Sequence, residues 1–145
     1  MYAGCPIVWA SKMQLLIALS STEAEYIALS TALREVIGVM NLLTELHQRG
    51  FNFNTKVPHI VCRTFEDNRS CIEIATNHKT RPRTKHLSVR LHHFRSHVVS
   101  KTITIEHIST KEQIADIFTK PLSRVQFTKL RDKLMSWQES PIARE

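Results

Sequence analysis

The feature that most constrains this chain is a long amphipathic helix near its start. The run from Ser20 to Glu25 contains two overlapping S/T-x-x-E capping boxes, a signature of a helix start. Gly50 supplies a stop signal, so the spacing predicts a helix that ends at about Arg49. One face should pack against an apolar partner, because apolar residues recur at three- and four-residue steps. These residues are Leu29, Ala32, Val36, Met40 and Leu43.

Shorter elements flank this helix. Apolar runs predict buried strands at residues 5–11, 15–19 and 57–66, and alternation predicts another at 102–108. Helical spacing or capping predicts helices at 68–77, 87–99, 110–120 and 124–137. Strands interleaved with helices indicate an α/β layer fold with a mixed sheet. We expect one domain over residues 1–137, followed by a polar tail at 138–145.

Cysteine usage and hydropathy indicate the compartment. Cys5, Cys62 and Cys71 are an odd number at wide spacing, which argues against a disulfide framework and for a reducing environment. The N-terminus lacks a charged region ahead of an apolar core, and no apolar run reaches the length of a membrane span. We therefore expect an intracellular protein, in cytoplasm or nucleus, that is neither secreted nor membrane-bound.

Positive charge is concentrated in one part of the chain. The whole chain has a formal net charge of +7, and no acidic residue lies between Glu73 and Glu106. That interval contains seven Lys or Arg and five His. A block of this kind indicates a polyanion partner, most simply nucleic acid. A solvated basic loop and helix face is the alternative, and composition alone does not choose between them.

Three carboxylates occupy positions where α/β folds place catalytic groups. Glu25 lies in the first turn of the long helix, Asp67 follows a predicted strand directly, and Asp116 lies early in the helix after the last strand. Hydrolysis of a phosphodiester with two metal ions needs carboxylates that converge on one point. We interpret the neighbouring Glu23 and Glu66 as solvent-facing.

Each of the three also has a structural interpretation. Glu25 could complete a capping box with Thr22, and Asp67 or Asn68 could cap the following helix. Asp116 could be a surface residue, although it lies among apolar neighbours. Spacing alone leaves both interpretations open.

Several stretches together resemble the RNase H domains of copia-type retrotransposon polyproteins. They are W-A-S-K at 9–12, A-L-S-S-T-E-A-E-Y-I-A-L-S at 18–30, F-E-D-N-R-S-C-I-E-I-A at 65–75, R-P-R-T-K-H-L at 81–87, H-H-F at 92–94 and Q-I-A-D-I-F-T-K-P-L at 113–122. The resemblance runs from about Pro6 to Leu130. The S-T-E-A-E-Y and A-D-I-F-T-K-P-L segments are together highly specific.

The resemblance implies a ribonuclease H-like fold, a five-stranded mixed sheet with helices on both faces. It implies cleavage of RNA in RNA–DNA hybrids with two Mg²⁺ (or Mn²⁺) ions, no small-molecule cofactor, and covalent linkage to reverse transcriptase. By motif, Glu25, Asp67 and Asp116 are the second, third and fourth catalytic, metal-binding carboxylates. The segment with Arg83, Lys85 and His86 is expected to contact phosphates of the nucleic acid.

The first carboxylate of the family has no counterpart here. It is an Asp on the central strand, upstream of the segment that matches residues 6–12, and no acidic residue precedes Glu23. We therefore expect an N-terminally truncated domain that lacks the central strand and is inactive or impaired as a nuclease. The alternatives are a non-catalytic nucleic-acid-binding module and a decayed retroelement fragment without function.

Overall fold

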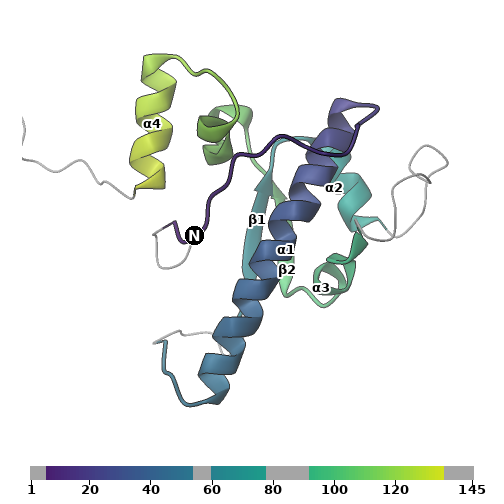
Figure 1. The fold of residues 1–145 in the computed structure, drawn as a ribbon, viewed down its shortest axis with the longest axis vertical. Coiled ribbons are helices and arrows are strands. Elements are labelled where there is room, and N and C mark those ends of the chain that lie inside the picture. The colour runs from purple at the N-terminus through teal and green to yellow at the C-terminus, as the bar shows by residue number, and fades with distance from the viewer. Residues whose placement is uncertain (1–5, 54–59, 78–91, 136–145) are drawn as a thin grey trace, which may run out of the picture. The chain divides into compact units, whose positions relative to one another are not determined.

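The computed structural model describes residues 6–53, 60–77 and 92–135. It divides into two compact units, one formed by residues 14–107 and the other by residues 1–13 with 108–145. The first unit contains a long helix and a two-stranded sheet flanked by two shorter helices (Figure 1). The second contains two 3-10 turns and one helix. Each unit is described by itself.

The long helix α1 spans Ser21–Gln48, which confirms the prediction. Ser20 is the N-cap, and its hydroxyl accepts a hydrogen bond from the backbone N–H of Glu23. The helix ends in a Schellman motif, in which Gly50 donates to the carbonyl of His47 and Phe51 to that of Leu46. Gly50 adopts a φ of 91°, a left-handed conformation that glycine takes without a steric penalty.

The buried face of α1 differs slightly from the predicted stripe. Leu29 and Met40 are buried as predicted, but Ala32 is exposed and the neighbouring Leu33 is fully buried. By length and composition alone, α1 could also cross a membrane. Its apolar character is explained without one, since its buried side chains belong to the core of the unit together with Cys71, Ala75, Phe94 and Ile103.

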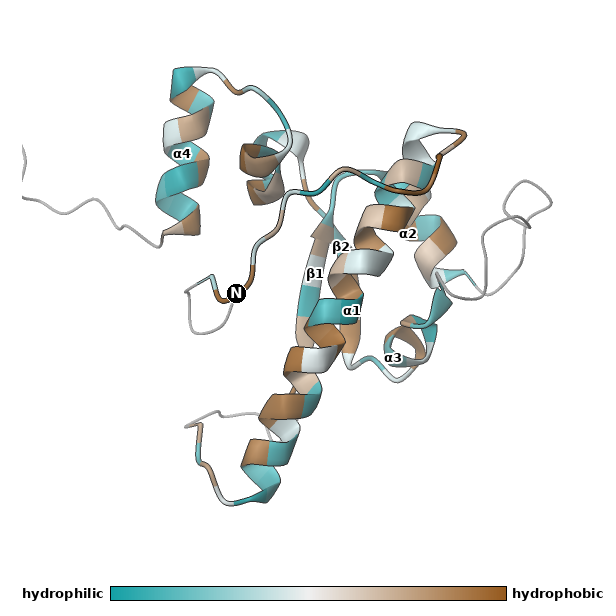
Figure 2. Cartoon of the chain, viewed as in Figure 1, coloured by the Kyte–Doolittle hydropathy of each residue, from teal (hydrophilic) through white to brown (hydrophobic). Residues whose placement is uncertain are grey.

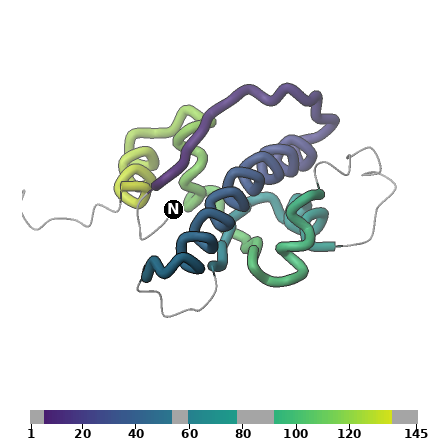
Figure 3. The backbone as a smooth tube through the Cα atoms, turned by 60° about the horizontal axis from the view of Figure 1, so that its bottom comes forward, coloured from purple at the N-terminus to yellow at the C-terminus, as the bar shows by residue number. Residues whose placement is uncertain are grey.

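A strand-helix-strand crossover forms the rest of this unit. Strand β1 (Cys62–Glu66) pairs in parallel with β2 (Ile103–His107). Between them lie α2 (Arg69–Thr76), as predicted, and α3 (Arg95–Val99). The second of these helices was predicted over residues 87–99, but the described residues 92–94 are not α-helical, so α3 is shorter than predicted. Figure 3 shows α1 passing beside β1 and α2, in agreement with their contacts. Parallel pairing across a helical connection fits an α/β fold; the complete mixed sheet stays a prediction.

The apolar segments before α1 are not strands. Residues 6–20 contain no strand, although residues 5–11 and 15–19 were predicted to be buried strands. Trp9, Leu15 and Ile17 are 64%, 97% and 89% exposed. Figure 2 shows this stretch as a largely hydrophobic run without regular structure. A strand requires a hydrogen-bonded neighbour, and the only sheet in the described residues pairs β1 with β2.

The second unit replaces a predicted helix with two tighter turns. The 3-10 helices η3 (Thr110–Glu112) and η4 (Ile114–Phe118) occupy the range predicted as one helix over residues 110–120. Gln113 separates them, because its ψ of 104° is extended and interrupts helical bonding. Helix α4 (Arg124–Leu134) follows, with the Ser123 hydroxyl accepting from the N–H of Gln126. It matches the predicted helix as far as the described residues extend.

Candidate functional site

Two of the three predicted carboxylates lie at the same end of β1. Asp67 follows the last residue of the strand, and Glu25 lies in the second turn of α1. Both are partly buried, and the negative charges of both act on a third carboxyl group, that of Glu66. The fold therefore gathers Glu25, Glu66 and Asp67 into an acidic cluster at the carboxyl end of a parallel strand, a common location for sites in α/β folds.

Glu66 is buried rather than solvent-facing, so that prediction is wrong. Its side chain is 6% exposed, and Oε1 accepts a hydrogen bond from the backbone N–H of Asn68 at 3.0 Å. The pKa of Glu66 is raised to about 7. Burial is the largest cause, the hydrogen bond from the Asn68 N–H opposes it, and the charges of Glu25 and Asp67 add to the increase. This carboxyl group is therefore partly protonated near neutral pH.

Strand parity could have identified Glu66. In β1, Cys62, Thr64 and Glu66 alternate with the exposed Arg63 and Phe65. Residues two apart share one face of a strand, so Glu66 must lie on the inner face if Cys62 does. Because Glu66 is acidic, it was predicted to face solvent, although the two-residue period of the strand places it on the inner face.

Helix capping explains Glu23, which is also buried and not solvent-facing as predicted. Its carboxylate accepts a hydrogen bond from the backbone N–H of Leu19 at 2.9 Å, beside the Ser20 cap. The capping role therefore falls to Glu23 rather than Glu25. At α2 it falls to Asn68, whose Oδ1 accepts from the N–H of Cys71 at 3.1 Å, rather than to Asp67.

Asp116, the third predicted carboxylate, is buried in the second unit. It lies in η4, is 7% exposed, and forms an ion pair with Lys120 whose Nζ–Oδ1 distance is 2.9 Å. The interpretation of Asp116 as a surface residue is therefore wrong. The positively charged Lys120 provides the compensation that a buried carboxylate requires.

The described side chains do not form a metal centre by themselves. Within residues 6–53, 60–77 and 92–135, no group of three or more His, Cys, Asp or Glu is arranged to hold a metal ion. The predicted Mg²⁺ or Mn²⁺ site therefore stays a prediction. The predicted phosphate contacts Arg83, Lys85 and His86 lie outside the described residues.

Cys71 contacts the acidic cluster from α2 but does not suit nucleophilic chemistry. It is fully buried, and burial raises the pKa of its thiol, with further increases from Glu66, Glu25 and Asp67. A thiol held protonated in this way is a small core residue, because the thiolate is the reactive form.

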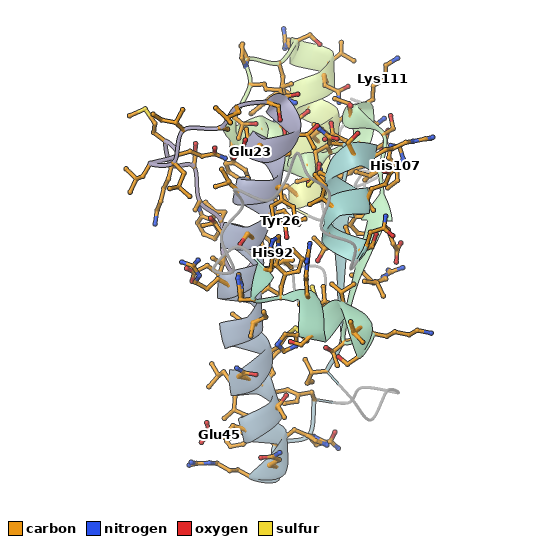
Figure 4. The ribbon with its side chains drawn as sticks, turned by 90° about the vertical axis from the view of Figure 1, so that its right-hand side faces the viewer. Glu23, Tyr26, Glu45, His92, His107 and Lys111 are labelled. Carbon is orange, nitrogen blue, oxygen red and sulfur yellow. The ribbon has the colours of Figure 1, made fainter. Side chains whose placement is uncertain are left out.

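A buried polar network lies next to Glu25 along α1. The Tyr26 hydroxyl is 2.5 Å from Nδ1 of His92, and Figure 4 shows the two side chains side by side. Burial raises the pKa of Tyr26, while burial and the charge of Arg95 lower the pKa of His92. Nδ1 of neutral His92 can therefore accept a hydrogen bond from the Tyr26 hydroxyl. Arg95 donates to the carbonyl of Ile74 at 3.1 Å, which ties α3 to α2.

Removing the tyrosine hydroxyl should destabilise this unit. We expect Tyr26→Phe to lower the free energy of unfolding by about 1–2 kcal/mol, because His92 loses its partner in a partly buried site. Urea unfolding followed by far-ultraviolet circular dichroism measures the change. Tyr26→Leu, which also removes the ring contact with Phe94, should cost more. If wild type and Tyr26→Phe have the same free energy of unfolding, the hydrogen bond between Tyr26 and His92 makes no net contribution to stability.

Comparison with known proteins relates the chain to retrotransposon polyproteins. It is 37% identical over 129 residues to the "Retrovirus-related Pol polyprotein from transposon RE1" of Arabidopsis thaliana, which covers 89% of this chain and 8% of that protein. The polyprotein from transposon RE2 of the same plant gives the same figures. The polyprotein from transposon TNT 1-94 of Nicotiana tabacum is 37% identical over 128 residues, 87% of this chain and 9% of that protein.

These similarities support the interpretation that the chain corresponds to a segment of a retrotransposon Pol polyprotein. The chain spans less than a tenth of the length of these relatives. No family model matches it, and no solved structure does.

Proposed function

We propose that this chain is an RNase H-like domain of a copia-type retrotransposon Pol polyprotein whose ancestral substrate is the RNA of RNA–DNA hybrids. The supporting observation is the position of Glu25 and Asp67, which act together on Glu66 at the carboxyl end of β1. Similarity to transposon Pol polyproteins supplies the context, and the resemblance of the S-T-E-A-E-Y and A-D-I-F-T-K-P-L motifs to RNase H domains supports the choice of domain.

In this proposal the carboxylates have distinct local roles. Glu25 and Asp67 are proposed oxygen donors beside the end of β1, and Asp116, in η4, is a further proposed carboxylate. When bound, divalent cations would activate water and stabilise the leaving oxygen. Glu66 is a positioning residue, because it is buried and its Oε1 accepts from the N–H of Asn68, the residue after Asp67.

We propose that the 145-residue sequence alone lacks a complete nuclease site. No acidic residue precedes Glu23, so nothing in residues 1–22 can replace the first family carboxylate. The lack of a three-ligand group among the described residues is consistent with this. A non-catalytic nucleic-acid-binding role is the second candidate, and the same observation favours it.

Cleavage of a labelled RNA–DNA hybrid tests the proposal. We expect the 145-residue chain to show no cleavage above background in Mg²⁺ or Mn²⁺, because its carboxylate set is incomplete. A longer chain that adds an upstream Asp-bearing strand of a transposon Pol polyprotein should cleave the RNA strand. Cleavage by the short chain, lost in Asp67→Asn, would show that another carboxylate completes the site. A well-folded longer chain without activity would refute the nuclease proposal.

A further inference from the structure

Asn68 contacts three elements of the first unit at once. Its backbone N–H donates to Glu66 Oε1 at the end of β1, at 3.0 Å. Its side-chain carbonyl accepts from the N–H of Cys71 at 3.1 Å, which caps α2. Its side-chain amide donates to the hydroxyl of Thr22, in the first turn of α1, at an Nδ2–Oγ1 distance of 3.5 Å. One partly buried residue therefore joins β1, α2 and α1.

The two side-chain contacts of Asn68 need the two different ends of an amide. The N–H of Cys71 requires an acceptor, so the carbonyl oxygen faces α2 and the NH₂ group is left to face Thr22. Serine and aspartate cap a helix as well as asparagine does. An ionised aspartate has no donor for the Thr22 hydroxyl, however, and a serine side chain is too short to reach both partners. Capping alone therefore does not account for an asparagine at this position.

The contact between Asn68 and Thr22 lies beside both proposed catalytic carboxylates. Asp67 directly precedes Asn68 in the chain. Glu25 follows Thr22 by three residues and therefore shares one face of α1 with it. The charges of Glu25 and Asp67 both act on Glu66, so the three carboxyl groups are close enough to repel one another when ionised. A hydrogen bond between the neighbours of these residues opposes that repulsion and limits how far α1 can move from the end of β1.

We propose that Asn68 is a positioning residue whose bond to Thr22 holds Glu25 and Asp67 close enough to share one divalent cation. This inference rests on the proposed function, which assigns the two carboxylates to a cation. Groups that orient metal ligands without touching the metal change the affinity for the metal about tenfold or more. Asn68 occupies such a place, because it adjoins one proposed ligand in the chain and is bonded to the helix that carries the other.

Binding of Mn²⁺ to the whole 145-residue chain tests the proposal without any nuclease activity. Bound Mn²⁺ broadens the NMR signals of nearby backbone amides, so a shared ion broadens those of Glu25 and Asp67 at the same Mn²⁺ concentration. We expect Thr22→Val and Asn68→Ser each to raise the concentration for half-maximal broadening about tenfold. Thr22→Ser keeps the hydroxyl, so it should restore binding to within about twofold of wild type.

Two control variants separate positioning from folding. Thr31→Val makes the same substitution elsewhere on α1, where the Thr31 hydroxyl donates to the carbonyl of Ile27 at 2.9 Å. Asn77→Ser makes the same substitution at the other end of α2. Each should change the Mn²⁺ concentration by less than about twofold. Because serine still caps α2, the urea midpoint of Asn68→Ser should lie within about 0.5 M of wild type.

The double variant tests whether the two residues act through one bond. If they do, Thr22→Val combined with Asn68→Ser should raise the Mn²⁺ concentration no further than either substitution alone. Two independent tenfold effects would instead multiply to about a hundredfold, and that result would overturn the proposed bond.

The outcomes separate this inference from the proposed function. Broadening of Glu25 and Asp67 that is unchanged in Thr22→Val and Asn68→Ser would overturn the positioning role and leave the proposed cation site standing. A wild-type chain in which Mn²⁺ broadens neither signal would refute the shared cation site and this inference with it. Weaker Mn²⁺ binding by Asn68→Ser, together with a well-folded longer chain that does not cleave, would support the positioning role and refute the nuclease activity alone.

Discussion

Replacing Glu66 by glutamine is expected to raise the free energy of unfolding by on the order of 3 kcal/mol at pH 8 and to leave it almost unchanged at pH 4. The reason is the pKa of Glu66, raised by burial from 4.5 to about 7 in the folded chain. Between these two values the folded state binds more protons than the unfolded state, so stability falls as pH rises. Above about pH 7 the full cost of burying the ionised carboxylate is present, and glutamine does not incur it.

Glutamine also preserves the local contacts. Its side-chain carbonyl can accept the Asn68 N–H that Glu66 Oε1 accepts at 3.0 Å, and its volume is nearly the same. The measurement is urea unfolding of both proteins at several pH values between 4 and 8. Glu45→Gln is the matched control, because Glu45 is exposed and pairs with exposed Arg49. A difference between wild type and Glu66→Gln that does not change with pH would contradict the raised pKa.

Local signals predicted the elements whose formation depends on neighbouring residues. The capping sequence before Glu25 and Gly50 defined α1, and Asn68 defined the start of α2. These signals act within one or two helical turns, so the sequence contains them completely. Glu25 and Asp67 could be placed at the same end of β1 for the same reason, since each adjoins a boundary that such signals define.

Features that depend on distant partners could not be predicted in the same way. The apolar run through Trp9 and Ile17 has strand composition, but pairing decides whether a strand forms, and the sequence does not show the neighbour. Asp116 was placed in a regular helix because the apolar spacing around it is helical. The extended conformation of Gln113 divides that helix into two 3-10 turns. The sequence has no Gly or Pro at this position that would signal the break.

Glu66 illustrates a different limit. An acidic residue is assigned to the surface by default, because burying a carboxylate normally costs free energy. In β1 the alternation of Cys62 and Thr64 with exposed residues places Glu66 inside nevertheless. Such a conflict between residue type and position is typical of functional sites, where a raised pKa is useful. The conflict itself is therefore a signal that sequence analysis can use.

The second large effect is expected at Asp67. In a longer chain that supplies the upstream carboxylate and cleaves the hybrid, Asp67→Asn should reduce the cleavage rate at least about a hundredfold, because the amide carries no charge for a divalent cation. Asp67 directly follows β1, which fixes its backbone, and the following Asn68 is fixed in turn as the cap of α2. The substitution should therefore alter the chemistry and not the fold.

Single-turnover cleavage of a labelled hybrid, at several Mg²⁺ concentrations, measures this effect. Glu106→Gln is the matched control, because Glu106 is an exposed carboxylate on β2 and its loss changes the net charge by the same amount. We expect that variant to stay within about twofold of the parent rate. A rate for Asp67→Asn equal to that of Glu106→Gln would remove Asp67 from the proposed site. A large loss of cleavage rate in Asp67→Asn and Glu25→Gln, but not in Glu106→Gln, would instead place the chemistry at the end of β1. The charges of Glu25 and Asp67 both act on Glu66 there.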